Sequence, residues 1–263
     1  MAERAFLFDV TRCTACRGCQ VACKQWNEHL GEETSNWGSY ENPRNLSPET
    51  WIKMRYIEAE RNGKLDWLFL RQACMHCQEA SCANVCPVGA IFKTDEGFVH
   101  IDQEWCIGCG NCVQACPFHV PHIDHHKGTS TKCSACTSVG LNRLWEGLEP
   151  ACIKSCPTNA LIMGDRDELM ADGSQRVQNL KASGHPNAYL YGENELGGLH
   201  VMYVLDDSPS AVYGLPDNPT VATSDVVGKW LSGLVTAGVV TALPFWLIFK
   251  RKQELASGNK GGA

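Results

Sequence analysis

The segment Cys106-Ile-Gly-Cys-Gly-Asn-Cys-Val-Gln-Ala-Cys-Pro117 decides the fold, because it carries four cysteines at the spacing C-x2-C-x2-C-x3-C. Three further segments repeat this spacing, starting at Cys13, Cys74 and Cys133. The first of them is identical in spacing, the second widens one gap to four residues, and the last widens one gap to fifteen. All 16 cysteines of the 263-residue chain fall within these four groups, so the motif occurs four times.

The spacing has a mechanical reason in iron–sulfur chemistry. Three thiolates two residues apart on a tight loop can reach three corners of a cubane of iron and sulfide, and the fourth corner needs a ligand from elsewhere. In two-cluster ferredoxins the fourth cysteine of each run ligates the other cluster, and a proline often follows it. Pro87, Pro117 and Pro157 follow the last cysteine of three groups, whereas Lys24 follows that of the first. The pattern predicts paired 4Fe-4S clusters.

Zinc and disulfide bonds are the alternative uses of so many cysteines. A zinc site typically takes two separated pairs of ligands, but in the first and third groups three cysteines crowd into seven residues. Cysteines two residues apart rarely bridge. The first twelve residues offer only Phe6, Leu7 and Phe8 as an apolar stretch, which is no secretory signal. We therefore favour iron–sulfur clusters and keep a zinc-bound scaffold without a redox role as the alternative.

Distance along the chain predicts which groups share clusters. The groups that start at Cys74 and Cys106 are close neighbours in sequence and should be partners, so the first and last groups pair around them. Four clusters with four ligands each then use every cysteine. The expected ligand sets are Cys13, Cys16, Cys19 and Cys156 for cluster A; Cys23, Cys133, Cys136 and Cys152 for cluster B; Cys74, Cys77, Cys82 and Cys116 for cluster C; and Cys86, Cys106, Cys109 and Cys112 for cluster D.

These pairings predict an α+β fold made of two nested ferredoxin-like two-cluster modules, with an added hairpin and one C-terminal transmembrane helix. The expected parts are an outer module at 1–35 and 120–172, an inserted β-hairpin region at 36–72, an inner module at 73–119, a C-terminal extension and linker at 173–224, the transmembrane helix at 225–249 and a basic cytoplasmic tail at 250–263.

Alternating and apolar runs predict the strands of each part. The expected strand pairs are Ala90–Lys93 with Phe98–Asp102, Phe6–Val10 with Ala160–Met163, and Trp51–Glu58 with Leu65–Leu70 around a turn at Arg61–Lys64. Helices are expected over Gln20–Leu30, from an N-cap at Asp165 to Met170, and from an N-cap at Ser174 to Ala182. Residues 206–224 are rich in Asp, Ser, Pro and Thr, which predicts a linker.

One segment is apolar enough to cross a membrane. From Trp230 to Phe249 the chain carries no charge, and at about 1.5 Å per residue such a helix spans the roughly 30 Å hydrocarbon core. Tryptophans near both ends and the Lys250-Arg-Lys252 stop suit the bilayer interface. Pro244 is compatible with a transmembrane helix. The alternative is a buried core helix.

The charges on either side of this segment predict its orientation. Three consecutive cations follow it, whereas mainly aspartates precede it, so the C-terminus is expected in the cytoplasm. The globular body then lies on the periplasmic side of the cytoplasmic membrane. Because no signal peptide is evident, there are two possibilities: the body stays in the cytoplasm, or it crosses the membrane already folded, together with a partner that carries the export signal. We favour the second.

The predicted clusters point to electron transfer. A 4Fe-4S cluster with a thiolate on every iron has no open position for a substrate. We find no G-x-G-x-x-G after a strand, no Walker loop and no nucleophile pattern, so no catalytic residues are expected in this chain. The formal net charge of −6 and the absence of a basic run in the body argue against nucleic acid as a partner.

Five basic residues lie within two positions of a ligand and are candidates for tuning the cluster potentials. A nearby cation stabilises the reduced, more negative cluster and raises its reduction potential. The alternative for each of them is an ordinary solvated surface charge. These residues are Arg12, Arg17, Lys24, Lys132 and Lys154.

The cysteine motifs together resemble one family. The stretches are FDVTRCTACRGCQVACKQWN at 8–27, CMHCQEASCANVCPVGAI at 74–91, CIGCGNCVQACPF at 106–118, and KCSAC with CIKSCPTNAL within 132–161. They resemble the four-cluster iron–sulfur subunit of molybdopterin oxidoreductases. The first stretch is most similar to the beta subunit of formate dehydrogenases, and the C-terminal helix is similar to that of the membrane-bound respiratory type.

The resemblance implies a set of partners and a route for electrons. It implies a catalytic subunit with pterin-bound molybdenum or tungsten, and a membrane cytochrome b subunit with haem b that passes electrons to quinone. It also implies export of the folded complex on the catalytic subunit's twin-arginine signal. The same kind of electron-transfer chain serves hydrogenases and sulfur-compound reductases, so these remain alternatives.

Overall fold

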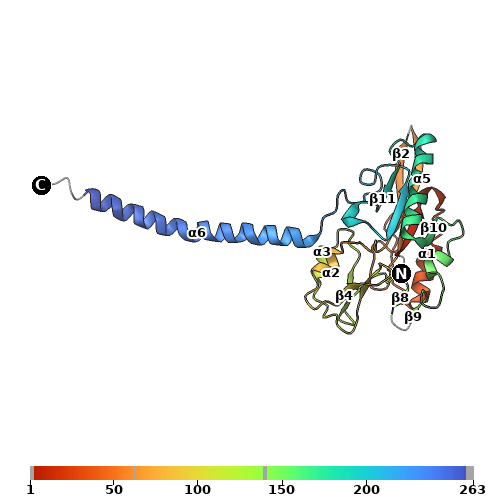
Figure 1. Cartoon of the computed structure of the whole chain (residues 1–263), viewed down its shortest axis with the longest axis horizontal. Helices are drawn as coiled ribbons and strands as arrows, with labels where there is room; N and C mark the ends of the chain where they lie inside the picture. The colour runs from red at the N-terminus through yellow and green to blue at the C-terminus, as the bar shows by residue number, and fades with distance from the viewer. Residues whose placement is uncertain (1–2, 62, 139–140, 259–263) are drawn as a thin grey trace. The chain divides into compact units, whose positions relative to one another are not determined.

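The structure is a computed structural model that describes residues 3–61, 63–138 and 141–258. It divides into two compact units, Met1–Val221 and Ala222–Ala263 (Figure 1). The first unit contains every cysteine, and the second contains the apolar helix. The two units are described separately.

A four-stranded sheet is the largest element of the first unit. Its strand order is β10-β1-β12-β11, formed by β10 (Leu161–Asp165), β1 (Arg4–Asp9), β12 (Val201–Leu205) and β11 (Tyr189–Tyr191). Phe6 lies opposite Met163, so the predicted pairing of these two segments is confirmed. Strand β12 runs parallel to β1 inside the sheet. Strands β11 and β12 of the predicted extension thus belong to this sheet, and every residue of β12 is buried.

One long helix covers a face of this sheet. Helix α5 (Arg166–Ala182) begins at Asp165, whose carboxylate accepts hydrogen bonds from two backbone N–H groups of the first turn, as predicted. The second predicted helix start, at Ser174, is wrong, because α5 continues through this position without a break. Gly173 lies against Leu7 and Leu190, and a side chain there would meet Leu190 at 2.8 Å. The small size of Gly173 therefore lets α5 lie close to the sheet.

Two hairpins project from the same unit. Strands β2 (Lys53–Arg61) and β3 (Lys64–Gln72) form the long hairpin that the sequence predicts, although Asn62 in its turn lies outside the described residues. Strands β4 (Ile91–Lys93) and β5 (Val99–Ile101) form the predicted short hairpin. Both strand pairs are antiparallel, which agrees with the expected topology.

Short elements connect these parts. They are η1 (Val10–Arg12), α1 (Gly18–Trp26), α2 (Ser81–Asn84), α3 (Asn111–Ala115), α4 (Ala151–Lys154), η2 (Glu195–Gly197), and the strand pairs β6 (His122–Asp124) with β7 (Thr129–Thr131) and β8 (Thr137–Ser138) with β9 (Leu141–Asn142). Helix α1 is shorter at its C-terminal end than predicted. It ends because the Asn27 amide donates to the Cys23 carbonyl at 2.7 Å and Glu28 takes a left-handed backbone with φ of 55°.

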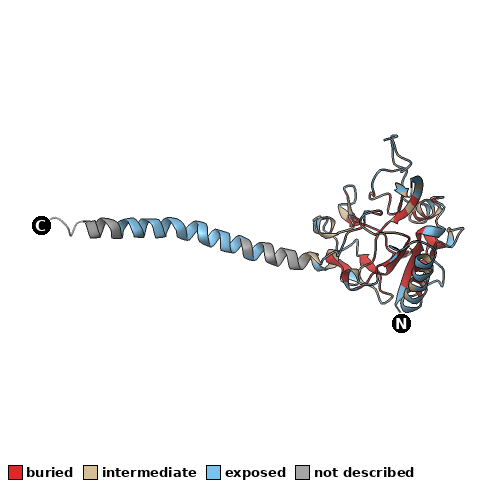
Figure 2. Cartoon of the chain, turned by 90° about the horizontal axis from the view of Figure 1, so that it is seen from above, coloured by how far each residue is buried: buried red, intermediate tan, exposed pale blue. Residues whose placement is uncertain are grey.

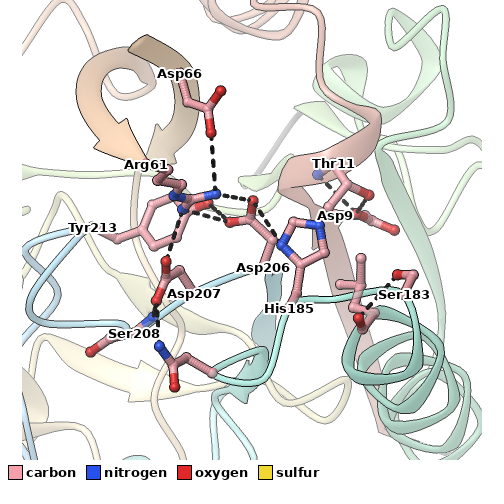
Figure 3. A network of polar contacts seen from close by, with 12 residues as sticks. Asp9, Thr11, Arg61, Asp66, Ser183, His185, Asp206, Asp207, Ser208 and Tyr213 are labelled. Atoms are coloured by element: carbon pink, nitrogen blue, oxygen red, sulfur yellow. Dashed lines mark hydrogen bonds and ion pairs between the residues drawn. The ribbon is translucent and has the colours of Figure 1, made fainter. Parts of the chain in front are cut away.

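A buried polar network ties the long hairpin to the end of the first unit (Figure 3). Arg61 at the hairpin tip donates to the Asp206 carboxylate at 2.7 Å, and the hydroxyl of Tyr213 donates to the same carboxylate. Burial opposes ionisation of Asp206, but these two hydrogen bonds hold its pKa below the usual value. Tyr213 is fully buried, so part of the predicted linker at 206–224 is packed into the unit.

The second unit is the helix α6 (Ala222–Gly258), which extends beyond both ends of the predicted 225–249. Its section Gly233–Lys252 is long and apolar enough to cross a membrane, and none of that section is buried (Figure 2). Large apolar side chains such as Leu234, Phe245 and Trp246 are exposed. An apolar surface of this extent is typical of a membrane or partner contact. The helix is consistent with the predicted membrane anchor.

Candidate metal centres

Two sets of cysteines line small pockets of the first unit. Cys13, Cys16 and Cys19 come from the loop and helix start after η1, and Cys156 joins them from the end of α4 to line one pocket. A second pocket is lined by the four cysteines expected at cluster D, which are Cys86, Cys106, Cys109 and Cys112. In both cases the structure brings together the side chains that the sequence assigned to one cluster.

The other eight cysteines lie in two groups, one buried and one mostly half-buried. Burial raises the pKa of Cys23, and its neighbours Cys133, Cys152 and Cys136 raise it further. Burial likewise raises the pKa of Cys77, and its neighbours Cys74, Cys116 and Cys82 add to that effect. These neighbourhoods correspond to the sets expected for clusters B and C, although their role as ligands stays a prediction.

Thiols of different sets also lie close enough to affect one another. Cys19 of set A lies close enough to Cys152 of set B to raise its pKa, although burial is the larger cause. Cys74 of set C acts in the same way on Cys133 of set B. Cys112 of set D has a smaller effect on Cys82 of set C, after burial and the set's own thiols. These effects link set A with set B, set B with set C, and set C with set D.

A repeated backbone turn directs the thiols of each group. The residue before the second cysteine has a left-handed backbone in all four groups, with φ of 52° at Ala15, 47° at His76, 62° at Gly108 and 53° at Ala135. This turn points N–H groups at sulfur. Ala15 donates to the Cys13 Sγ at 3.4 Å and Ala135 to the Cys133 Sγ at 3.4 Å. Gly108 allows a close contact as well, because a Cβ there would lie 2.2 Å from a backbone oxygen.

The three Cys-Pro sequences share a second turn. The third residue after each of these cysteines has a positive φ, namely Gly89, His119 and Asn159. In each case its N–H donates to the carbonyl of the cysteine, at 3.4, 3.1 and 3.5 Å. The first group lacks the proline, and its last cysteine lies inside α1 instead. The sequence difference at Lys24 thus marks a real difference in local structure.

The chemistry of these donor sets fits iron–sulfur clusters. All 16 cysteines are free thiols, and each set offers four sulfurs. Burial raises the pKa of Cys133 to about 11 and that of Cys136 to about 12. Such thiols are neutral at pH 7 until a metal binds, and binding releases their protons. Among the described residues no three His, Cys, Asp or Glu side chains converge as they would on one metal ion; a cubane has four irons and holds its ligands farther apart.

The five predicted tuning cations lie in different surroundings. Lys24 is engaged by Glu32 at 3.2 Å, and Lys154 is exposed. Arg12 pairs with Asp9 at 3.4 Å, and Arg17 donates to the Tyr56 hydroxyl at 3.0 Å while lining the pocket of set A. Lys132 alone among them is buried, with 5% of its surface exposed.

Two features of Lys132 and its surroundings were hidden in the sequence. Lys132 is adjacent to Cys133 of set B, yet its charge acts on Cys77, Cys82 and Cys116 of set C. A second buried cation, Arg71 on β3, lies near sets A and B and was not predicted. Its signal in the sequence is a lone arginine within an otherwise apolar strand end, Leu68-Phe-Leu-Arg71.

The comparisons with known proteins agree with these sites. Two 4Fe-4S dicluster domain families match residues 65–166 and 12–90. The fold and the four thiol sets thus define a ferredoxin-like protein that carries four 4Fe-4S clusters and transfers electrons.

The similarity to whole proteins is more specific. The nitrate-inducible formate dehydrogenase iron–sulfur subunit of Escherichia coli is 42% identical over 91% of this chain and 81% of its own length. The formate dehydrogenase-O iron–sulfur subunit of the same bacterium is 42% identical over 87% of this chain and 75% of its own length. The chain belongs to the family of formate dehydrogenase iron–sulfur subunits. The hydrogenase-2 operon protein HybA is 34% identical over 82% of this chain and 74% of its own length.

Proposed function

We propose that this chain is the electron-transfer subunit of a formate-oxidising complex. Its clusters A, B, C and D are held by the four ligand sets expected from the sequence. The observation that supports the proposal is that four cysteines line each of two pockets and that the other eight lie near one another in two groups. We infer that the four clusters form a row in the order A, B, C, D. Electrons entering at one end can pass from cluster to cluster without any chemistry at an open metal position.

The ligand sets make the architecture two nested modules. Sets A and B combine cysteines from both ends of the cysteine-rich region, whereas sets C and D use only residues 74–116. The inner module is built on the β4–β5 hairpin and the outer module on the β1–β10 strand pair. This division is supported by the mutual effects of the thiols within each set.

The ends of the row are the points of electron entry and exit. Cys16 of set A and Cys109 of set D are exposed, whereas the thiols of set B are buried. Val221, the last residue of the first unit, lines a pocket with Ala83 and Asn84 of the inner module. The first unit therefore ends beside the inner module, which favours cluster D as the end that faces the membrane and cluster A as the end that faces the catalytic subunit.

The partners follow from this direction. A catalytic subunit with pterin-bound molybdenum or tungsten supplies electrons at cluster A, and a membrane cytochrome b subunit accepts them at cluster D. The exposed apolar surface of α6 contacts lipid or that subunit. The cations Lys250, Arg251 and Lys252 keep the C-terminus in the cytoplasm, so the clusters lie on the periplasmic side.

Reduction by substrate tests this function. The complex is extracted in mild detergent under anaerobic conditions, and its iron and acid-labile sulfide are measured. About sixteen of each are expected for every copy of this chain, in addition to the metal and sulfide of its partners. Formate is expected to bleach the broad cluster absorbance. Bleaching by hydrogen without bleaching by formate assigns the chain to a hydrogenase, and colourless protein without iron overturns the electron-transfer role itself.

A further inference from the structure

Arg71 occupies an unusual position on the long hairpin. It is fully buried, with 0% of its surface exposed. On β2 its direct cross-strand partner is Met54, so the two side chains share one face of the hairpin. Met54 lines the pocket of set A and lies 3.7 Å from the Cys19 Sγ. The Nη2 of Arg71 lies 4.0 Å from the Cys152 Sγ of set B. This face of the hairpin therefore covers both outer sets.

The guanidinium of Arg71 has no ordinary explanation within the described part of the chain. Its Nε and Nη1 groups are buried and find no hydrogen-bond partner there. No carboxylate of the described residues pairs with it, although other buried cations such as Lys53 have such a partner. Burying an arginine without an anion costs several kcal/mol. The anion that offsets this cost must come from the thiol sets.

The surrounding thiols belong to both outer sets. Burial dominates the pKa of Cys19, Cys23, Cys133 and Cys152, and the positive charge of Arg71 lowers each of them. A cubane with four thiolates is anionic and becomes more so when it takes up an electron. A fixed cation between two such groups favours the reduced state of both.

We propose that Arg71 raises the reduction potentials of clusters A and B together. In this proposal its unpartnered N–H groups interact with the negative charge of these clusters. The inference rests on the proposed function. The redox step moves one electron from one cluster to the next, and Arg71 keeps all its protons. No bond is made or broken. Arg71 is a positioning and tuning residue rather than a catalytic one.

Potentiometric titration of the holo complex tests this role. Arg71→Met removes the charge and keeps an apolar side chain of similar length, and Arg71→Lys keeps the charge. Arg55→Met removes the charge of another arginine of the same hairpin, which donates to the Tyr213 carbonyl at 2.8 Å, and is the matched control. Reduction is followed by electron paramagnetic resonance under anaerobic conditions, with iron and sulfide measured on each sample.

The expected result is selective. In Arg71→Met the reduction equilibrium of two clusters falls at least tenfold, which is about 59 mV for a one-electron couple, while the other two clusters are unchanged. Arg71→Lys and Arg55→Met shift no cluster by as much as tenfold. Unchanged potentials in an Arg71→Met complex with full iron overturn the inference, as does an equal shift of all four clusters.

Loss of iron is handled by the lysine variant. If Arg71→Met fails to keep its clusters, Arg71→Lys decides, and a tenfold shift in that charge-preserving variant overturns the role of charge. An absence of iron from the unmodified complex contradicts the proposed function instead, so the two failures can be told apart.

Discussion

The proposed outer and inner modules hold the same kind of sites by different means. The outer module rests on a four-stranded sheet whose apolar core under α5 includes Ala5, Leu7, Leu190, Met202 and Val204. The inner module rests on two strands of three residues each, and among the described residues its own small core consists of Ala80, Ile91, Val99, Ile101 and Cys112. Its Met75 and Phe98 pack into a larger core together with residues of the four-stranded sheet.

The difference follows from the distances that the ligands span in sequence. Sets A and B bring Cys13–Cys23 to Cys133–Cys156, so a long loop must be closed, which costs conformational entropy. Extensive packing offsets this cost. Sets C and D join residues much nearer in sequence, and the clusters themselves can serve as the core. Packing therefore dominates in the outer module and metal ligation in the inner one.

The largest test of this contrast is removal of iron. A strong iron chelator under anaerobic conditions is expected to unfold the inner module, because a core this small depends on metal for stability. In hydrogen exchange, amides of β4 and β5 should lose protection while those of β1 and β12 keep most of theirs. A mock-treated sample is the control. Equal loss of protection in both modules contradicts the contrast.

The next effect concerns packing in the outer module. Leu7 is buried in the sheet core, with 1% of its surface exposed. We expect Leu7→Ala to lower the free energy of unfolding by about 2–5 kcal/mol, because it leaves a cavity. Leu65→Ala on the exposed part of β3 is the matched control, with a change within about 0.5 kcal/mol. Denaturant unfolding followed by far-UV circular dichroism measures both. Similar losses in the two variants would count against a packing-dominated sheet.

The smallest expected effect is that of the buried Lys132 charge on the reduction potential of cluster C. Lys132 donates to the Val99 and Cys133 carbonyls, and its charge acts on the thiols of set C. Lys132→Met is expected to lower the reduction equilibrium of cluster C by up to about tenfold, or 59 mV, with clusters A and B unchanged. The exposed Lys154→Met serves as the reference. A redox titration in which cluster A or B moves instead would refute this assignment.

The sequence by itself determined the iron–sulfur character, because the spacing of cysteines on a loop limits which metals they can bind. It also determined three strand pairs, since alternation and turn residues act over short distances. The pairing β1–β10 shows that even a distant contact can be read when both segments flank matching motifs.

Only the tertiary structure decided which charges face the clusters and how the sheet is completed. Nothing near Arg71 in sequence marks it as a neighbour of Cys152, because hairpin packing brings the two together. Lys132 faces a different set from the cysteine beside it. Strand β12 lies in the sheet parallel to β1, and all of its residues are buried there. Local patterns specify turns and ligands, whereas packing between distant segments specifies surroundings.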